Sequence, residues 1–243
     1  MPRRSLLVAI LSIALIWLSN AAGRCRAADG CGWLDAPGDC SHDPLSPCEV
    51  YHPQPGDMVF FSHDHLRSRL VYALAHTGKP YHVGLVVNLP DGRPAILEAG
   101  PYDYVHVYLM DLLPRLRTHE GGIWVRRLRV PLSPCESAHL TEFALAQTGK
   151  RFALFRVILQ ATPFRAHGSL HSCVFGSSRI DRHSWFCSEL VIAALAFVGR
   201  INPHRIKPNA IFPRDLFRDD PFNLKPCWEA PRRWTCEPVG SRQ

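Results

Sequence analysis

Short apolar runs separated by turn residues predict most strands of this chain. Met58 to Phe61 follows a Pro-Gly turn signal and is typical of a buried strand. The runs HVGLVVN (82–88) and PAILEAG (94–100) flank a turn that contains Asp91 and Gly92, which predicts a β-hairpin. Further strands are expected in YVHVYLM (104–110) and IWVRRLRV (123–130).

Helical periodicity with recognisable end signals predicts helices among and after these strands. The clearest has Ser133 as its N-terminal cap, with Pro134 as its first helical residue. Glu136 completes a capping box, and Gly149 ends the helix. Other helices are expected within 64–78, 151–160 and 183–199. Because strands and helices segregate, the fold class is α+β, with an antiparallel sheet packed against helices.

The two ends of the chain differ in pattern from this core. Residues 24–52 are rich in Gly, Pro, Asp and Cys and lack a sustained period, so an irregular, cross-linked lead-in is expected. Four segments follow from the pattern: a signal peptide (1–23), this Cys-rich lead-in (24–52), the core domain (53–220) and a Pro- and Cys-containing tail (221–243).

The N-terminus has the pattern of an export signal. Arg3 and Arg4 precede an uninterrupted apolar run from Leu6 to Leu18, and small residues follow it. A membrane-spanning helix needs roughly 20 apolar residues, so the shorter run indicates a secretory signal peptide. We therefore expect a secreted or periplasmic protein, with an uncleaved N-terminal membrane anchor as the alternative.

Composition describes an ordinary globular protein. Of 243 residues, 47% are hydrophobic and 20% charged. The net charge of +7 comes from scattered residues, without the aromatic-interleaved basic motif of a nucleic-acid binder. No nucleic-acid partner is expected. The basic excess indicates solubility, or attraction to an anionic envelope or lipid surface.

Nine cysteines in an exported chain predict disulfides. Cys25, Cys31, Cys40 and Cys48 are separated by five, eight and seven residues, which is not the spacing of a zinc site. Most cysteines other than Cys187 are therefore interpreted as disulfide staples of the lead-in and tail. Their connectivity stays open, and the odd count does not single out Cys187.

Cys187 is the strongest candidate for chemistry. Ser184 can cap the helix that follows, which places Cys187 in its first turn, where unpaired N–H groups and the helix dipole favour a thiolate. The same N–H groups can stabilise an oxyanion. Position alone leaves two alternatives open, a buried filler thiol and a disulfide partner.

His82 and Glu98 are the candidate base and orienting carboxylate. His82 opens an apolar strand, and Glu98 is a lone carboxylate near the end of the other hairpin arm. A two-residue turn would make paired residue numbers sum to 183 and put the two side chains on opposite faces. An odd loop, such as Pro90 to Gly92 with a left-handed Gly92, makes pairs sum to 182 and brings both to one face. The Cys–His–Glu triad therefore requires an odd hairpin loop.

Other polar residues are interpreted as structural. Glu189 complements the helix dipole at the start of its helix. The pair His167 and His171 has the spacing of a zinc site on a helix, but Gly168 and Ser169 disfavour a helix there. No metal and no cofactor are expected.

Four motifs in order, PGDMVFF, HVGLVV, LEAGP and FCSELV, carry a family resemblance. The chain resembles the circularly permuted papain-like cysteine hydrolases of the YiiX/YaeF type, within the NlpC-like superfamily, and more distantly lecithin:retinol acyltransferase-like proteins. The resemblance covers roughly 54–217 and implies a permuted papain-like fold. It also implies Cys187 as nucleophile, His82 as base and Glu98 as the orienting third residue. The Cys-rich lead-in and the tail depart from the family pattern.

The expected function is a secreted thiol amidase or peptidase that acts on cell-wall peptides or related amides. One alternative keeps the same residues but hydrolyses lipid esters or transfers acyl groups. Another is a catalytically inactive, disulfide-stapled binding domain. The expected partner is thus a peptide, amide or acyl substrate, peptidoglycan or lipid among the candidates, and no partner protein is predicted.

Overall fold

The computed structural model describes residues 30–35, 48–62, 78–100, 105–160 and 162–236. The predicted signal peptide (1–23) and the predicted helix within 64–78 lie outside the described residues, as do Cys25 and Cys40.

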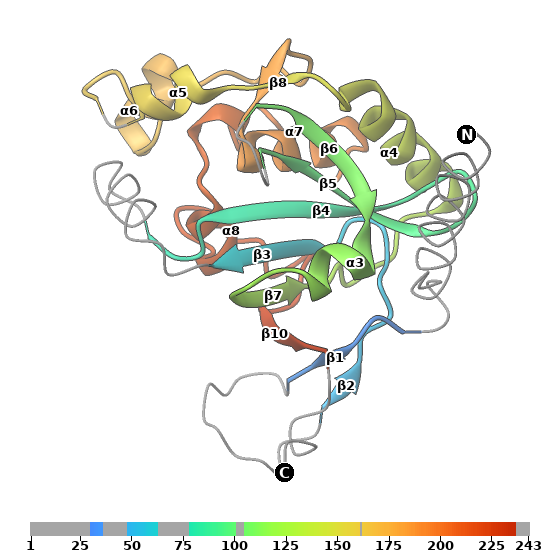
Figure 1. Ribbon diagram of the computed structural model, residues 1–243. Helices are drawn as coiled ribbons and strands as arrows, with labels where there is room; N and C mark the ends of the chain where they lie inside the picture. The colour runs from blue at the N-terminus through green and yellow to red at the C-terminus, as the bar shows by residue number, and fades with distance from the viewer. Residues whose placement is uncertain (1–29, 36–47, 63–77, 101–104, 161, 237–243) are drawn as a thin grey trace, which may run out of the picture.

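An eight-stranded antiparallel sheet forms the centre of the molecule, in the order β2-β1-β10-β7-β3-β4-β5-β6 (Figure 1). This confirms the prediction of a mixed fold with a large antiparallel sheet. The strands are β1 (Trp33–Leu34), β2 (Glu49–Val50), β3 (Met58–Ser62), β4 (His82–Asn88), β5 (Pro94–Ala99), β6 (Val107–Asp111), β7 (Gly122–Arg126) and β10 (Arg232–Thr235). A separate parallel pair joins β8 (Arg151–Phe152) to β9 (Ser184–Trp185).

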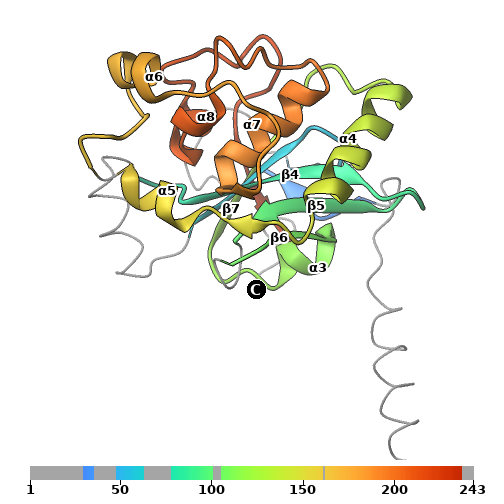
Figure 2. The same ribbon diagram turned by 90° about the horizontal axis from the view of Figure 1, so that it is seen from above.

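The described residues form six α-helices. Helices α4, α7 and α8 cover one face and α3 covers the other (Figure 2). The helices are α3 (Leu112–Arg117), α4 (Pro134–Gln147), α5 (Leu154–Leu159), α6 (Ser169–Phe175), α7 (Cys187–Phe197) and α8 (Pro213–Arg218). In the described ranges no helix has the length and apolar character needed to cross a membrane.

Helix α4 confirms the capping prediction in detail. Ser133 accepts a hydrogen bond from the Glu136 backbone, the Glu136 carboxylate accepts one from Ser133 N–H, and Pro134 is the first helical residue. These contacts satisfy backbone donors that a helix start leaves unpaired.

The lead-in and tail are more regular than their composition predicts. Strands β1 and β2 come from the lead-in, and β10 comes from the tail. Trp33 pairs with Thr235 and Arg232 pairs with Val125, so these ends extend the central sheet. The sequence prediction of irregular ends missed them because strands of two to four residues show no measurable period.

The cysteines follow the disulfide prediction only in part. Cys31 is disulfide-bonded. The tail cysteines Cys227 and Cys236 are exposed free thiols, and so are Cys135 and Cys173, which corrects their interpretation as staples. Backbone pairing of β10 with β1 and β7 holds the tail instead.

Candidate functional site

Cys187 is the first residue of α7. The residue before it, Phe186, is extended (φ −104°, ψ 166°), and the helix starts directly after it. The predicted cap, Ser184, lies in β9 instead, two residues too early. Cys187 is nevertheless in the first turn, as expected, and it is a free thiol that is 6% exposed.

The hairpin between β4 and β5 has the odd loop that the triad requires. Leu85 pairs with Leu97 and Asn88 pairs with Pro94, so paired residue numbers sum to 182. The loop consists of residues 90–92, closed by the hydrogen bond from Leu89 N–H to the Arg93 carbonyl. Its last residue, Gly92, has φ +81°, a conformation that glycine adopts without steric cost. This register places the side chains of residues 82 and 98 on one face.

His82 and Glu98 are in direct contact. His82 Nε2 lies 2.7 Å from Glu98 Oε2. Glu98 is fully buried, while 14% of the His82 side chain is exposed. A Cβ built on Gly84, whose number pairs with 98 in this register, would lie 2.7 Å from Glu98 Cγ and 2.7 Å from Ile96 Cδ1. The absence of a side chain at Gly84 therefore gives Glu98 the room to reach His82.

His82 and Cys187 meet although they belong to opposite sides of the sheet. Val83 packs with α7 on one face, and Val86 packs with α3 on the other. His82 shares the α3 side with Val86, because strand side chains alternate. His82 is the first residue of β4, and there the neighbouring Cys187 raises its pKa. Because Glu98 contacts Nε2 of His82, Nδ1 is the ring nitrogen of His82 that can face the Cys187 sulfur.

Arg115 is a member of the site that sequence reasoning missed. Its Nε donates to Glu98 Oε1 at 3.0 Å, and its terminal nitrogen donates to Oε2 at 3.1 Å. The guanidinium also lies 4.2 Å from the centre of the Phe61 ring. Arg115 is 6% exposed. A two-pronged contact of this kind fixes the plane of the carboxylate that holds His82.

These contacts set the charges of the site. Burial lowers the pKa of His82, but its hydrogen bonds and charge interactions with Cys187 and Glu98 outweigh burial and raise the pKa to about 9. Burial raises the pKa of Glu98, yet His82 and Arg115 together bring it below its ordinary value. His82 is thus cationic at neutral pH.

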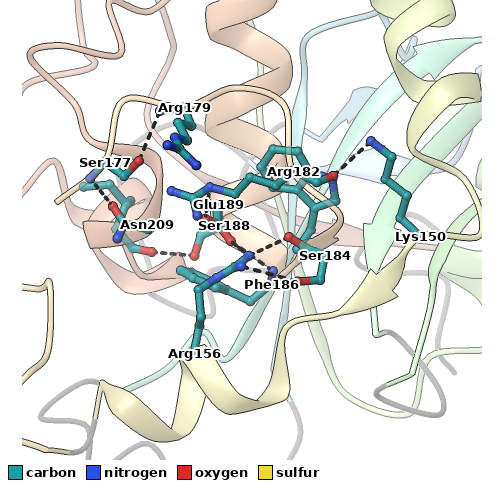
Figure 3. Close-up of polar contacts among 12 residues, drawn as sticks. Lys150, Arg156, Ser177, Arg179, Arg182, Ser184, Phe186, Ser188, Glu189 and Asn209 are labelled. Atoms are coloured by element: carbon teal, nitrogen blue, oxygen red, sulfur yellow. Dashed lines mark hydrogen bonds and ion pairs between the residues drawn. The ribbon is translucent and has the colours of Figure 1, made fainter. Parts of the chain in front are cut away.

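Glu189 is more than the helix-start charge that was predicted. It is fully buried, and Arg156 Nη2 donates to its Oε2 at 2.7 Å while Arg182 Nε lies 3.1 Å from Oε1 (Figure 3). Arg156 also donates to the Ser184 carbonyl. Burial raises the pKa of Glu189, and the two arginines offset this only in part. The cluster ties α5 and the segment before Cys187 to the first turn of α7.

His167 and His171 do not share a helix turn. Helix α6 begins at Ser169, so His171 is helical while His167 precedes the helix and contacts Asp215 at 3.1 Å. The expectation of no helix here was wrong, since Gly168 (φ +102°) serves as the residue before the helix. Across the described ranges, no cluster of three or more His, Cys, Asp or Glu residues could hold a metal ion.

No protein-family model matches the chain, and no curated protein matches its sequence. Among solved structures it is similar to the metalloprotein yiiX from Escherichia coli O157:H7, DUF1105. The two are 20% identical, with a TM-score of 0.43, over 63% of this chain and 69% of that chain. This weak likeness assigns neither a family nor a reaction.

Substituting Gly84 by alanine should damage both the fold and the site. The added methyl group meets Glu98 and Ile96, and we expect about 1–3 kcal/mol of lost stability together with reduced reactivity of Cys187. Chemical denaturation and thiol alkylation measure the two effects. Gly78→Ala is the matched control, because its Cβ meets only the flexible end of Arg214 at 3.3 Å. Equal behaviour of the two variants would contradict the packing argument.

Proposed function

We propose that this chain is a thiol hydrolase that cleaves an acyl bond with Cys187, His82 and Glu98, on cell-wall peptides or related amides. One observation carries the proposal: a helix-start cysteine raises the pKa of a histidine whose Nε2 contacts a buried carboxylate. Nucleophile, base and orienting group in this order are the requirements of covalent acyl transfer. A circularly permuted papain-like fold is part of the same proposal.

The chemistry follows from the contacts. His82 holds the proton of Cys187, and the thiolate attacks the acyl carbon to form a carbon–sulfur bond. The backbone N–H of Cys187 lies at the start of α7 and can donate to the resulting oxyanion. His82 then gives its proton to the leaving amine or alcohol. Water, deprotonated by His82, cleaves the thioester and restores the thiol.

The substrate class is tested by offering two panels to the same protein. The full chain is incubated with muropeptides and, separately, with phospholipid esters, and products and the acylated protein are identified by mass. An acyl group on Cys187 from muropeptides supports the proposal. The matched Cys187→Ala variant must give neither product nor adduct. Turnover that persists in this variant would overturn the assignment.

A second candidate is hydrolysis or transfer of lipid acyl groups by the same residues. It is favoured by exposed apolar side chains of α5, such as Leu154 and Phe155. Helix α5 follows β8, and Cys187 follows β9, the strand that pairs with β8. An acyl-enzyme formed from phospholipid but not from muropeptide would select this candidate.

The pH dependence should report His82. Its protonated form, which supplies the proton to the leaving group, is present below a pKa of about 9 and is lost as the pH rises through it. We expect kcat/KM for an amide substrate to fall above about pH 9. Alkylation of Cys187 by iodoacetamide needs no such proton and should show no decline there. A fall centred near pH 6.5, the ordinary value for histidine, would contradict the geometry.

A further inference from the structure

The helices α5 and α6 carry an apolar surface that nothing in the described structure covers. Figure 1 shows both helices at the edge of the molecule, away from the central sheet. No residue of α5 is buried. We call this surface the α5–α6 face and define it by Leu154, Phe155, Ile158, Phe164, Leu170 and Val174, each more than half exposed.

The exposed side chains follow helical spacing. Leu170 and Val174 are one turn apart on α6 and are 80% and 74% exposed, and Leu154 and Ile158 have the same spacing on α5. Phe164 packs edge-on against Phe175, with ring centres 6.1 Å apart. Six large apolar side chains that are more than half exposed within residues 154–174 indicate an interaction site.

The segment that forms this face is basic in sequence, although Asp181 pairs with Lys150 and Asp215 contacts His167 at its border. From Phe143 to Ile180 the sequence has no Asp or Glu, whereas it holds Lys150, Arg151, Arg156, Arg165 and Arg179. Arg151 and Arg179 are exposed. Apolar side chains bordered by cations complement a surface with anionic headgroups above hydrocarbon.

The face adjoins the candidate catalytic cysteine. Strands β8 and β9 are parallel, with Phe152 beside Trp185, and Ala153 N–H donates to the Trp185 carbonyl. The chain therefore leaves both strands in the same direction, into Leu154 of α5 on one side and Cys187 of α7 on the other. An ion pair between Arg156 of α5 and Glu189 of α7 also joins the two helices (Figure 3).

We propose that the α5–α6 face binds the surface of a lipid bilayer containing anionic lipids, and so holds Cys187 beside the membrane interface. Aliphatic and aromatic side chains enter the boundary between headgroups and acyl chains, and the arginines contact phosphates. A protein partner would be expected to offer acidic side chains opposite these arginines. The docking does not depend on the proposed hydrolysis, since a variant without the thiol retains the whole face.

Hydrogen exchange of the full chain, mixed with vesicles, tests the docking segment by segment. This readout stays informative even if the N-terminal apolar run itself associates with lipid. With vesicles of phosphatidylcholine and about 30 mol% phosphatidylglycerol, we expect amide exchange across 154–175 to slow about tenfold or more. Vesicles of phosphatidylcholine alone should give a much smaller effect.

Three variants test which side chains cause the slowed exchange. The triple variant Phe155→Ser, Leu170→Ser, Val174→Ser should lose the slowing, and Arg151→Gln with Arg179→Gln should lose its dependence on anionic lipid. Val130→Ser is the matched control, since Val130 is 65% exposed but lies outside the face. Exchange in β4 reports that each variant is folded. Equal exchange at 154–175 with and without vesicles would overturn the proposal, as would slowing that depends only on protein concentration, which assigns the face to a second copy.

Discussion

Replacing Cys187 by alanine should lower kcat/KM by at least about 10⁴-fold, the largest effect expected from any single substitution in this chain. The variant keeps the contact between His82 and Glu98 but has no atom that can form the acyl intermediate. Adding His82→Ala to this variant should cost almost nothing more, because groups that act as one unit are not additive. Steady-state kinetics on the substrate identified by the acyl adduct measure both effects.

Cys135 provides a matched control for this prediction. It is also a free cysteine in the first turn of a helix, and its sulfur lies 4.0 Å from His139 Nε2. It is exposed, however, and lies outside the Cys187 site. Cys135→Ala should leave kcat/KM within about twofold of the native value. Loss of activity in this variant, or its survival in Cys187→Ala, would refute the assigned nucleophile.

The hairpin shows what local sequence can predict about this site. The sequence leaves a two-residue turn at Asp91–Gly92 and a three-residue loop at 90–92 open, and the observed register of β4 and β5 selects the second. Strand alternation places His82 and Glu98 on one face when the loop has three residues. The observed pairing has this loop, and the two side chains are in contact.

Arg115 shows where such reasoning stops. It lies on a short helix among LLPRLR, and nothing in that pattern separates a buried arginine from the exposed Arg117. Its partner Glu98 is fixed only after β5, β6 and α3 have folded against one another. A buried carboxylate at Glu98 was the available signal, because a buried charge requires a partner.

The start of α7 was misjudged for a related reason. Ser184 has the side chain of a good cap, but pairing of β9 with β8 holds it in an extended strand. Its hydroxyl instead accepts a hydrogen bond from Arg156. The local preference for a cap was overridden by strand pairing with Arg151 and by the hydrogen bond from Arg156, 28 residues earlier in the chain. The cysteine kept its position in the first turn because the helix began slightly later.

Replacing Glu98 by glutamine should lower kcat/KM by about 10²- to 10⁴-fold and also destabilise the protein. The amide cannot stabilise the His82 imidazolium, so the pKa of His82 falls and the alkaline decline of activity moves to lower pH. Arg115, which is 6% exposed, loses its counter-charge, and a buried pair broken in this way costs about 3–5 kcal/mol. The pH profile and denaturant unfolding measure the two consequences separately.

The double variant Glu98→Gln, Arg115→Met separates positioning from charge burial. Removing both charges should restore most of the stability lost in Glu98→Gln, while activity stays low because His82 still lacks its carboxylate. Glu136→Gln is the control for the substitution itself, since Glu136 is paired with Arg200 at 2.8 Å but lies far along the chain on α4. It should change neither activity nor the pH profile. If Glu98→Gln did not change the pH at which kcat/KM declines, the carboxylate would contribute only to stability and would not position His82.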